Sequence, residues 1–241
     1  MTTVLLVRHG RTSANTAGVL AGRSRGVALD ETGVRQAADA GARIASLPIR
    51  AIVTSPLQRC RQTAQALLAA RTEPVPIVVE RGILECGYGE WTGRKLSELS
   101  KDPLWSTVQQ QPSAVRFPGG EAMSEISARA VSTIRAWDAR IAAEHGDQAL
   151  WVAVSHGDVI KAILADALGM HLDAFQRILV NPASVSVVRY TSARPYVATM
   201  NSSTGDLASF APPPAQHGRR RSKKAAATDA PVGGGLGAGT T

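Results

Sequence analysis

The stretch Val4–Thr12, with the sequence VLLVRHGRT, decides the fold of this chain. It begins with an apolar run of valine and leucine, which is typical of a strand buried on both faces, as in a parallel sheet. The run stops at Arg8, His9 and Gly10, so these residues should leave the carboxyl end of a central strand. Ligands bind at that edge of open α/β sheets. Gly10 allows the chain to turn sharply beside a ligand.

Two later stretches repeat this arrangement of a β-rich run, polar residues and a helical pattern. One is Ser55–Ala64 (SPLQRCRQTA), which contains Arg59, and the other is Val152–Asp158 (VAVSHGD), which contains His156. Because the carboxyl ends of parallel strands meet at one edge of a sheet, we expect the three stretches to present two arginines and two histidines to a common site.

In this order, the three motifs resemble those of the histidine phosphatase superfamily, the phosphoglycerate-mutase-like proteins. Each motif alone is a weak signal, but three of them at strand-to-helix junctions form a strong one. The resemblance covers about residues 3–200. It implies phosphoryl-transfer chemistry at the shared sheet edge.

Outside these motifs, hydrophobic periodicity predicts alternating strands and helices. Further strands are expected at about residues 50–54, 77–79 and 151–155, with a closing pair at 184–190 and 196–200. Helices are expected at about residues 30–46, 56–70, 95–111 with a break at Pro103, 121–145 and 158–168. This alternation predicts an α/β fold, a three-layer α/β/α sandwich with a mostly parallel central sheet. The first of these helices should bury small apolar residues, namely Val34, Ala37, Ala38, Ala42, Ile44 and Ala45.

The 241 residues suffice for one domain with a sizeable core, which we place at residues 1–210. Residues 211–241 are rich in proline, basic residues and glycine, and they are predicted to be a disordered tail. The tail holds five basic residues and one acidic residue, which is half of the net charge of +8. The remaining domain is mildly basic, so we expect no nucleic-acid partner.

Other features of the sequence bear on compartment and assembly. No apolar run reaches the length of a membrane span, and the chain starts without a signal-peptide pattern, so cytoplasmic residence without a membrane partner is the expectation. The two cysteines, Cys60 and Cys86, are interpreted as small buried residues without a disulfide. Dimers are common in the resembling family, so a homodimer is one expected state.

The charge and shape of a phosphoryl group predict which residues bind it. A phosphoryl dianion needs fixed positive charge, and the planar guanidinium groups of Arg8 and Arg59 match its oxygens. His156 can add a hydrogen bond and, when protonated, a charge. By resemblance, Asn15 and more weakly Thr12 contact phosphate. The side chains of Arg11, Arg23 and Arg25 are interpreted as solvated charges, with a second anionic group of the substrate as the alternative contact.

The resemblance assigns the nucleophile and the proton donor. His9 is the nucleophile that forms a phosphohistidine, although by position alone His156 could equally serve. Glu85 matches the family's acid, which protonates the leaving alkoxide, and Glu90 and Asp158 are weaker candidates. Glu85 should then have a pKa raised by burial. No metal-ligand spacing is present, and we expect no metal or other cofactor.

These residues favour a phosphatase that hydrolyses a small phosphorylated metabolite. The loop around Glu85 resembles the phosphatase members more than the glycolytic mutases, and the spacing from Glu85 to His156 is short for such a mutase. The alternatives are a phosphoglycerate-mutase-type phosphomutase and a non-catalytic phospholigand-binding protein. The sequence does not identify the substrate.

Overall fold

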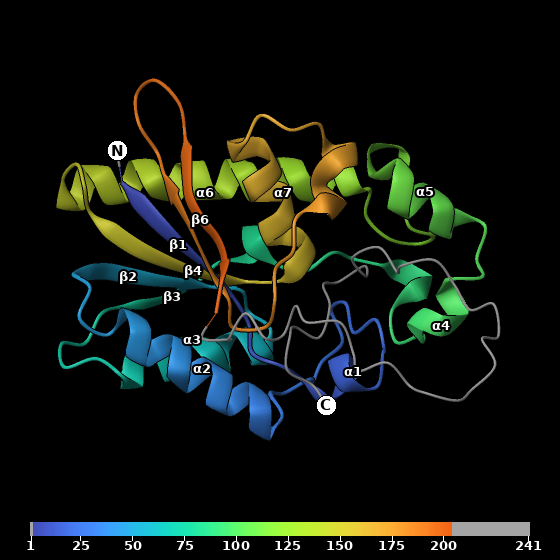
Figure 1. Cartoon of the computed structure of the whole chain (residues 1–241), viewed down its shortest axis with the longest axis horizontal. Coiled ribbons are helices and arrows are strands. Elements are labelled where there is room, and N and C mark those ends of the chain that lie inside the picture. The colour runs from blue at the N-terminus through green and yellow to red at the C-terminus, as the bar shows by residue number, and fades with distance from the viewer. Residues whose placement is uncertain (1, 204–241) are drawn as a thin grey trace, which may run out of the picture.

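A computed structural model describes residues 2–203 and contains one six-stranded sheet in the order β3-β2-β4-β1-β5-β6 (Figure 1). The strands are β1 (Thr3–Arg8), β2 (Ile49–Thr54), β3 (Ile77–Val79), β4 (Leu150–Ser155), β5 (Val185–Arg189) and β6 (Tyr196–Ser202). The first four in this sheet, β3, β2, β4 and β1, are parallel, and β5 and β6 are antiparallel additions at one edge. The predicted mostly parallel sheet is therefore confirmed.

Strand β1 lies between β4 and β5 and is buried on both faces, as its apolar run predicts. Val4 and Leu6 belong to the core beneath α6 (Met123–His145) and α7 (Gly157–Ala167), whereas Leu5 and Val7 belong to the core beneath α2 (Glu31–Ile44) and α3 (Gln58–Ala69). Successive side chains of a strand point to opposite faces. An unbroken apolar strand therefore fits only a sheet covered on both sides.

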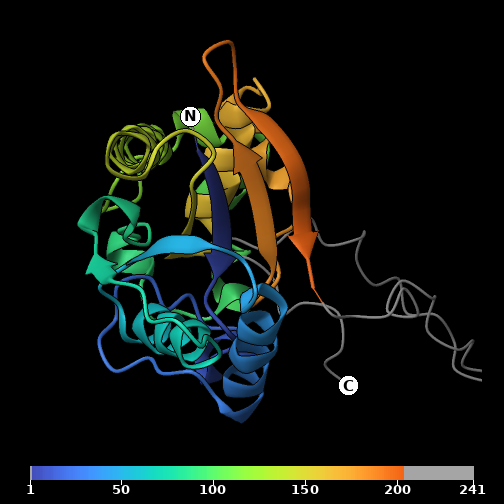
Figure 2. The same ribbon diagram turned by 90° about the vertical axis from the view of Figure 1, so that its left-hand side faces the viewer.

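Helices cover the two faces of the sheet, giving the three layers that Figures 1 and 2 show from perpendicular directions. The helices are α1 (Ser13–Thr16), α2 (Glu31–Ile44), α3 (Gln58–Ala69), α4 (Leu96–Leu99), α5 (Leu104–Gln110), α6 (Met123–His145) and α7 (Gly157–Ala167). Short 3₁₀ turns are η1 (Arg81–Ile83), η2 (Gly89–Trp91), η3 (Pro112–Ala114) and η4 (Leu172–Arg177). Helices α2 and α3 cover one face, and α6 and α7 cover the other.

The buried face of α2 differs from the predicted one. Three residues expected on it are exposed: Val34, Ala38 and Ala42. Glycines take their place, because a Cβ on Gly33 would lie 2.0 Å from the carbonyl oxygen of Arg11, and one on Gly41 would lie 3.0 Å from that of Ala66. The helix therefore packs through bare backbone against the turn after β1 and against α3. Ala37 and Ile44 are buried as predicted, but a pattern built on apolar side chains missed the two glycines.

Two further predictions concern the chain as a whole. Within residues 2–203, no helix combines the length and the hydropathy needed to cross a membrane. The predicted tail, residues 211–241, lies outside the described part of the chain, so the boundary placed at residue 210 stays a prediction.

Candidate active site

Three neighbouring strands carry polar residues to one edge of the sheet. His9 follows β1, Arg59 is the second residue of α3 after β2, and His156 caps the N-terminus of α7 directly after β4. Main-chain hydrogen bonds extend the sheet ladder past the strand ends: the His9 amide donates to the Ser155 carbonyl at 3.0 Å, and the Ser55 amide donates to that of Val154 at 3.0 Å. The sheet register thus places these residues side by side.

Arg59 joins the two histidines. Its Nε donates to His9 Nε2 at 3.2 Å, and its Nη2 lies 3.3 Å from His156 Nδ1. The centroids of the two imidazole rings are 5.3 Å apart. The three side chains are almost completely buried, and Arg59 Nη1 is a buried donor with no hydrogen-bond partner among the described residues. A buried donor without a partner is costly, and an anion would satisfy it.

The hydrogen bonds of His9 fix the state of its ring. Because arginine only donates, His9 Nε2 carries a lone pair, and its Nδ1–H donates to the Gly10 carbonyl at 2.8 Å. Burial, followed by the charges of Arg59 and Arg8, holds the pKa of His9 well below its ordinary value. The imidazole is therefore neutral, with its lone pair on the side of Arg59, which is the state that a nucleophile requires.

His156 is also neutral in this structure. Burial and then the Arg59 charge hold the pKa of His156 well below its ordinary value. Its Nδ1 accepts from Arg59, so its Nε2–H donates to the Ser55 hydroxyl at 2.8 Å. Ser55 was not among the predicted site residues, although its place between β2 and α3, before a proline, marks it as a residue of the same edge.

Arg8 is fully buried at the end of β1. Its Nη1 donates to the Val180 carbonyl at 2.8 Å. Burial lowers the pKa of Arg8 to about 10, partly offset by the charges of Glu85 and Asp158, so the guanidinium remains cationic at neutral pH. The site therefore contains two fixed positive charges, Arg8 and Arg59, next to two neutral histidines.

Glu85 lies in the irregular segment after η1 and reaches the same site. Its Oε2 is 3.7 Å from His156 Nδ1, and its Oε1 accepts from the Cys86 amide at 2.9 Å. Burial, then the charge of Asp158, raises the pKa of Glu85 to about 7, against the lowering effect of Arg59 and Arg8. A carboxyl group with such a pKa can carry a proton near neutral pH, as a general acid must.

The two weaker acid candidates occupy different environments. Glu90 is exposed at the surface. Asp158 is fully buried; it accepts a 2.7 Å hydrogen bond from the Tyr88 hydroxyl and lies 3.6 Å from Lys161 Nζ. Asp158 thus has a structural set of partners and acts on Glu85 through its charge.

Similarity to known proteins identifies the family. The sequence profile of the histidine phosphatase superfamily (branch 1) matches residues 4–203. The chain belongs to this superfamily.

Relatives in the superfamily differ in length and name. The chain is 31% identical over 201 residues to a probable phosphoglycerate mutase, GpmB, of Erwinia tasmaniensis, covering 83% of this chain and 89% of that protein. It is 32% identical over 191 residues to the bifunctional protein Rv2228c of Mycobacterium tuberculosis, covering 78% of this chain. The chain spans only 50% of the length of that second relative.

Solved structures of the superfamily share the fold. Bacillus stearothermophilus YhfR has a TM-score of 0.74 and 26% identity, covering 86% of this chain and 98% of its own. A mycobacterial glucosyl-3-phosphoglycerate phosphatase solved with VO3 also has a TM-score of 0.74, at 21% identity, over 83% of this chain and 99% of its own.

Asn15, expected near the phosphate, makes its hydrogen bonds to Thr12. Thr12 caps α1, and the side-chain Oδ1 of Asn15 accepts from the Thr12 amide at 3.0 Å and from its hydroxyl at 2.9 Å. These bonds hold the turn that follows Gly10. A contact of Asn15 with phosphate stays a prediction.

The two cysteines are free and buried, and one of them contacts the site. Cys60 Sγ lies 3.5 Å from His156 Nε2. Burial raises the pKa of Cys60 to about 12, so the thiol stays protonated at neutral pH. Its Sγ also donates to the Ser155 carbonyl at 3.5 Å, so Cys60 is a buried thiol with polar contacts.

Two of the three arginines interpreted as solvated charges have defined partners. Arg11 Nε lies 2.8 Å from the Asp30 carboxylate, and Arg23 Nε donates to the Glu85 carbonyl at 2.8 Å. Arg25 is exposed. The solvated interpretation is therefore wrong for Arg11 and Arg23, because the turn after β1 and the loop after α1 fold back onto acceptors that are distant in sequence.

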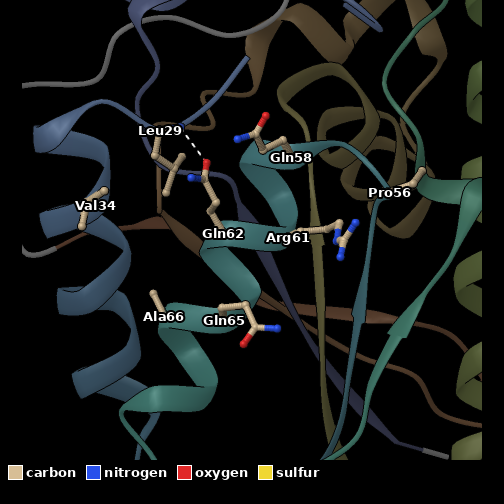
Figure 3. Close-up of a pocket in the computed structure, with 8 residues that line it drawn as sticks. All are labelled: Leu29, Val34, Pro56, Gln58, Arg61, Gln62, Gln65 and Ala66. Carbon is tan, nitrogen blue, oxygen red and sulfur yellow. Dashed lines mark hydrogen bonds between the residues drawn. The ribbon is translucent and has the colours of Figure 1, made fainter. Parts of the chain in front are cut away.

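A separate groove lies between α2 and α3, with a volume of about 640 Å³ (Figure 3). It is lined by Leu29, Val34, Pro56, Gln58, Arg61, Gln62, Gln65 and Ala66. The Gln62 side chain extends from α3 toward Leu29, and its Oε1 accepts from the Leu29 main-chain amide at 2.9 Å. None of the arginines or histidines of the site lines this groove, so the groove is distinct from the chemistry described above.

Proposed function

We propose that this protein is a phosphatase that hydrolyses the phosphomonoester of a small metabolite through a phosphohistidine on His9. The state of His9 carries the proposal: its Nδ1–H is engaged by Gly10, and its Nε2 lone pair faces Arg59. A neutral imidazole next to fixed cations can approach a phosphoryl dianion without losing its nucleophilic nitrogen to a proton.

Arg8, Arg59 and His156 hold the phosphoryl group in this scheme. The guanidinium groups neutralise its charge, and the unpartnered Nη1 of Arg59 gains an acceptor. A dianion beside His156 favours the protonated ring, which reverses the effect of burial and adds a third positive charge. Asn15 supplies a further contact from the turn after Gly10.

The reaction then takes two displacements. In the first, a bond forms between His9 Nε2 and phosphorus while the phosphorus–oxygen ester bond breaks, and the leaving alkoxide takes the proton of Glu85. In the second, a water molecule gives a proton to the Glu85 carboxylate and attacks phosphorus. The nitrogen–phosphorus bond breaks, inorganic phosphate leaves, and both side chains return to their starting states.

A mutase is the second candidate, and the similarity to a probable phosphoglycerate mutase favours it. Both activities share the first displacement. They differ in whether water or a second hydroxyl group takes the phosphoryl group from His9. A phosphatase and a mutase therefore require the same site residues, and only the product of the reaction distinguishes them.

The test is a phosphate-release screen over a panel of phosphomonoesters, with alkaline quenching to retain phosphohistidine. We expect release of inorganic phosphate at a rate that a bisphosphate does not increase, and a phosphoryl group trapped on His9 during turnover. His9→Ala should lower turnover by at least about 10⁴-fold. His171→Ala is the matched control, since His171 is exposed and its contacts are with Asp173, which is not a residue of the site.

The other outcomes have distinct meanings. Isomerised product with little free phosphate assigns a mutase. Saturable binding of phosphomonoesters without label or turnover assigns a binding protein. A phosphoryl group trapped on His156 in place of His9 overturns the assignment of the nucleophile.

A further inference from the structure

Two arginines from separate parts of the chain converge on the main-chain carbonyl of Glu85. Arg23 Nε donates to this oxygen at 2.8 Å, and Arg129 Nη2 donates to it at 3.1 Å. Arg23 follows α1, and Arg129 lies in α6. Two charged donors on one neutral carbonyl form an unusually strong restraint, because hydrogen bonds to charged groups exceed those between neutral groups.

Glu121 holds the two arginines together. Its carboxylate lies 2.7 Å from Arg23 Nη2 and 3.0 Å from Arg129 Nε, and it accepts from the Gly87 amide at 2.9 Å. Partial burial opposes ionisation, but the bonds from Arg129 and Gly87 hold the pKa of Glu121 below its ordinary value. The group formed by Arg23, Glu121 and Arg129, here the arginine clamp, is thus charged and mutually bonded at neutral pH.

The arginine clamp also contacts the chain before Glu85, and a residue adjacent to it contacts Arg59. Arg129 Nη1 donates to the Gly82 carbonyl at 2.9 Å, which fixes the chain just before Glu85. Next to Arg23, the Gly22 carbonyl accepts from Arg59 Nη2 at 2.8 Å. The residue pair 22–23 therefore connects the arginine that faces the histidines with the segment that carries the acid.

The segment of Glu85 needs such a restraint. Glu85 belongs to neither a helix nor a strand, so no ladder of main-chain hydrogen bonds sets its position. A proton donor must lie within hydrogen-bond reach of the leaving oxygen, and a displacement of about 1 Å can cost about 100-fold in rate.

From these contacts, and on the basis of the proposed function, we infer that Arg23, Glu121 and Arg129 are positioning residues that hold Glu85 at the leaving-group oxygen. They act on the reaction through the Glu85 main chain. The consequence is specific: loosening the clamp impairs protonation of the leaving group and leaves phosphate binding by Arg8, Arg59 and His156 in place.

The leaving group provides the test. Arg23→Gln and Glu121→Gln are compared with the wild-type protein on an alkyl phosphate, whose alkoxide needs a proton, and on 2,4-dinitrophenyl phosphate, whose phenolate does not. We expect kcat/KM for the alkyl ester to fall about 10-fold or more and that for the dinitrophenyl ester to change by less than about 2-fold. Arg129→Lys, which keeps the charge and loses the planar fork, should give a smaller loss of the same pattern.

Arg135→Gln is the matched control, because Arg135 lies in the same helix α6 and pairs with Asp166 at 2.7 Å away from the Glu85 segment. Arg135→Gln should leave kcat/KM for both substrates unchanged. Equal losses on both substrates, or a raised KM for both, would overturn the inference, since they indicate general damage or direct substrate contact. Failure of the proposed function is distinct: the wild-type protein would then hydrolyse neither ester.

Discussion

The two halves of the site are held in place by different means. His9 and His156 directly follow the adjacent strands β1 and β4, and Arg59 lies in the first turn of the helix after β2; main-chain hydrogen bonds between the strand ends set their spacing. Glu85 stands in an irregular segment whose position depends on side chains from α6 and from the loop after α1. Main-chain hydrogen bonds thus position His9, Arg59 and His156, the proposed phosphate half. A few charged side chains position Glu85, the proposed acid half.

This difference has a chemical counterpart. In the proposed reaction, the phosphate half binds a group that every phosphomonoester shares, so its geometry need not vary among substrates. The acid half would then meet the leaving group, which differs from one substrate to the next. A loop restrained by side chains can change with few substitutions, whereas strand ends cannot shift without disturbing the sheet.

The largest effect should come from the phosphate half. Arg59→Ala removes the group that bridges the two histidines. One stabilising donor in such a site is worth about 10²- to 10³-fold, and Arg59 supplies more than one, so we expect kcat/KM to fall about 10³-fold or more. Steady-state kinetics should show the same loss on alkyl and dinitrophenyl phosphates. A loss confined to the alkyl ester would contradict the division of the site into two halves.

The next effect belongs to the acid half. Glu85→Gln keeps the shape of the side chain and an acceptor for the Cys86 amide, but it cannot donate a carboxyl proton. We expect kcat/KM for the alkyl ester to fall about 10²- to 10³-fold, and that for the dinitrophenyl ester to fall far less. Comparable losses on the two esters would remove Glu85 from the role of proton donor.

The sequence predicted the phosphate half and missed much of the acid half, for a physical reason. Arg8, His9 and His156 follow apolar runs, so strand patterning alone places them at one edge of the sheet. The partners of Glu85 come from elements whose relative positions no local pattern encodes. Arg23 was therefore interpreted as a solvated charge, and Glu121 and Arg129 were not singled out.

A similar limit explains the error in α2. Its buried face uses Gly33 and Gly41, where backbone meets backbone, so hydrophobic periodicity assigned burial to Val34 instead. The order of the strands in the sheet and the antiparallel attachment of β5 also depend on tertiary packing. The strands themselves, including the short β3, were predicted within a few residues of their observed bounds.

A smaller effect of Glu85→Gln concerns stability: the variant should lose activity but gain stability. The pKa of Glu85 is raised from its ordinary 4.5 to about 7 in the folded protein, so folding becomes less favourable as pH rises through that interval. Glu85→Gln removes this cost, and the free energy of unfolding at about pH 8 should increase by on the order of 1–3 kcal/mol. Urea unfolding at about pH 8 and pH 4 measures it; an equal change at both values would indicate another cause.

The smallest expected effect is a shift of the pH profile. Activity that needs protonated Glu85 falls as pH rises through about 7, and the buried charge of Asp158 helps to keep the proton there against Arg59 and Arg8. Asp158→Asn should move the alkaline limb of kcat/KM to lower pH. Taking the ratio of variant to wild type cancels the ionisation of the substrate, and an unchanged limb would contradict this coupling.

The bond from Arg59 to His9 has one more consequence. In the resting protein, the reactive lone pair of His9 is occupied by a guanidinium hydrogen, which shields it from stray electrophiles. An incoming phosphate is the group best able to draw that hydrogen away, because it offers the arginine a stronger acceptor. In the proposed mechanism, the ligand thus exposes the nitrogen that attacks it. Diethyl pyrocarbonate should therefore modify His9 slowly in the wild-type protein and faster in Arg59→Ala.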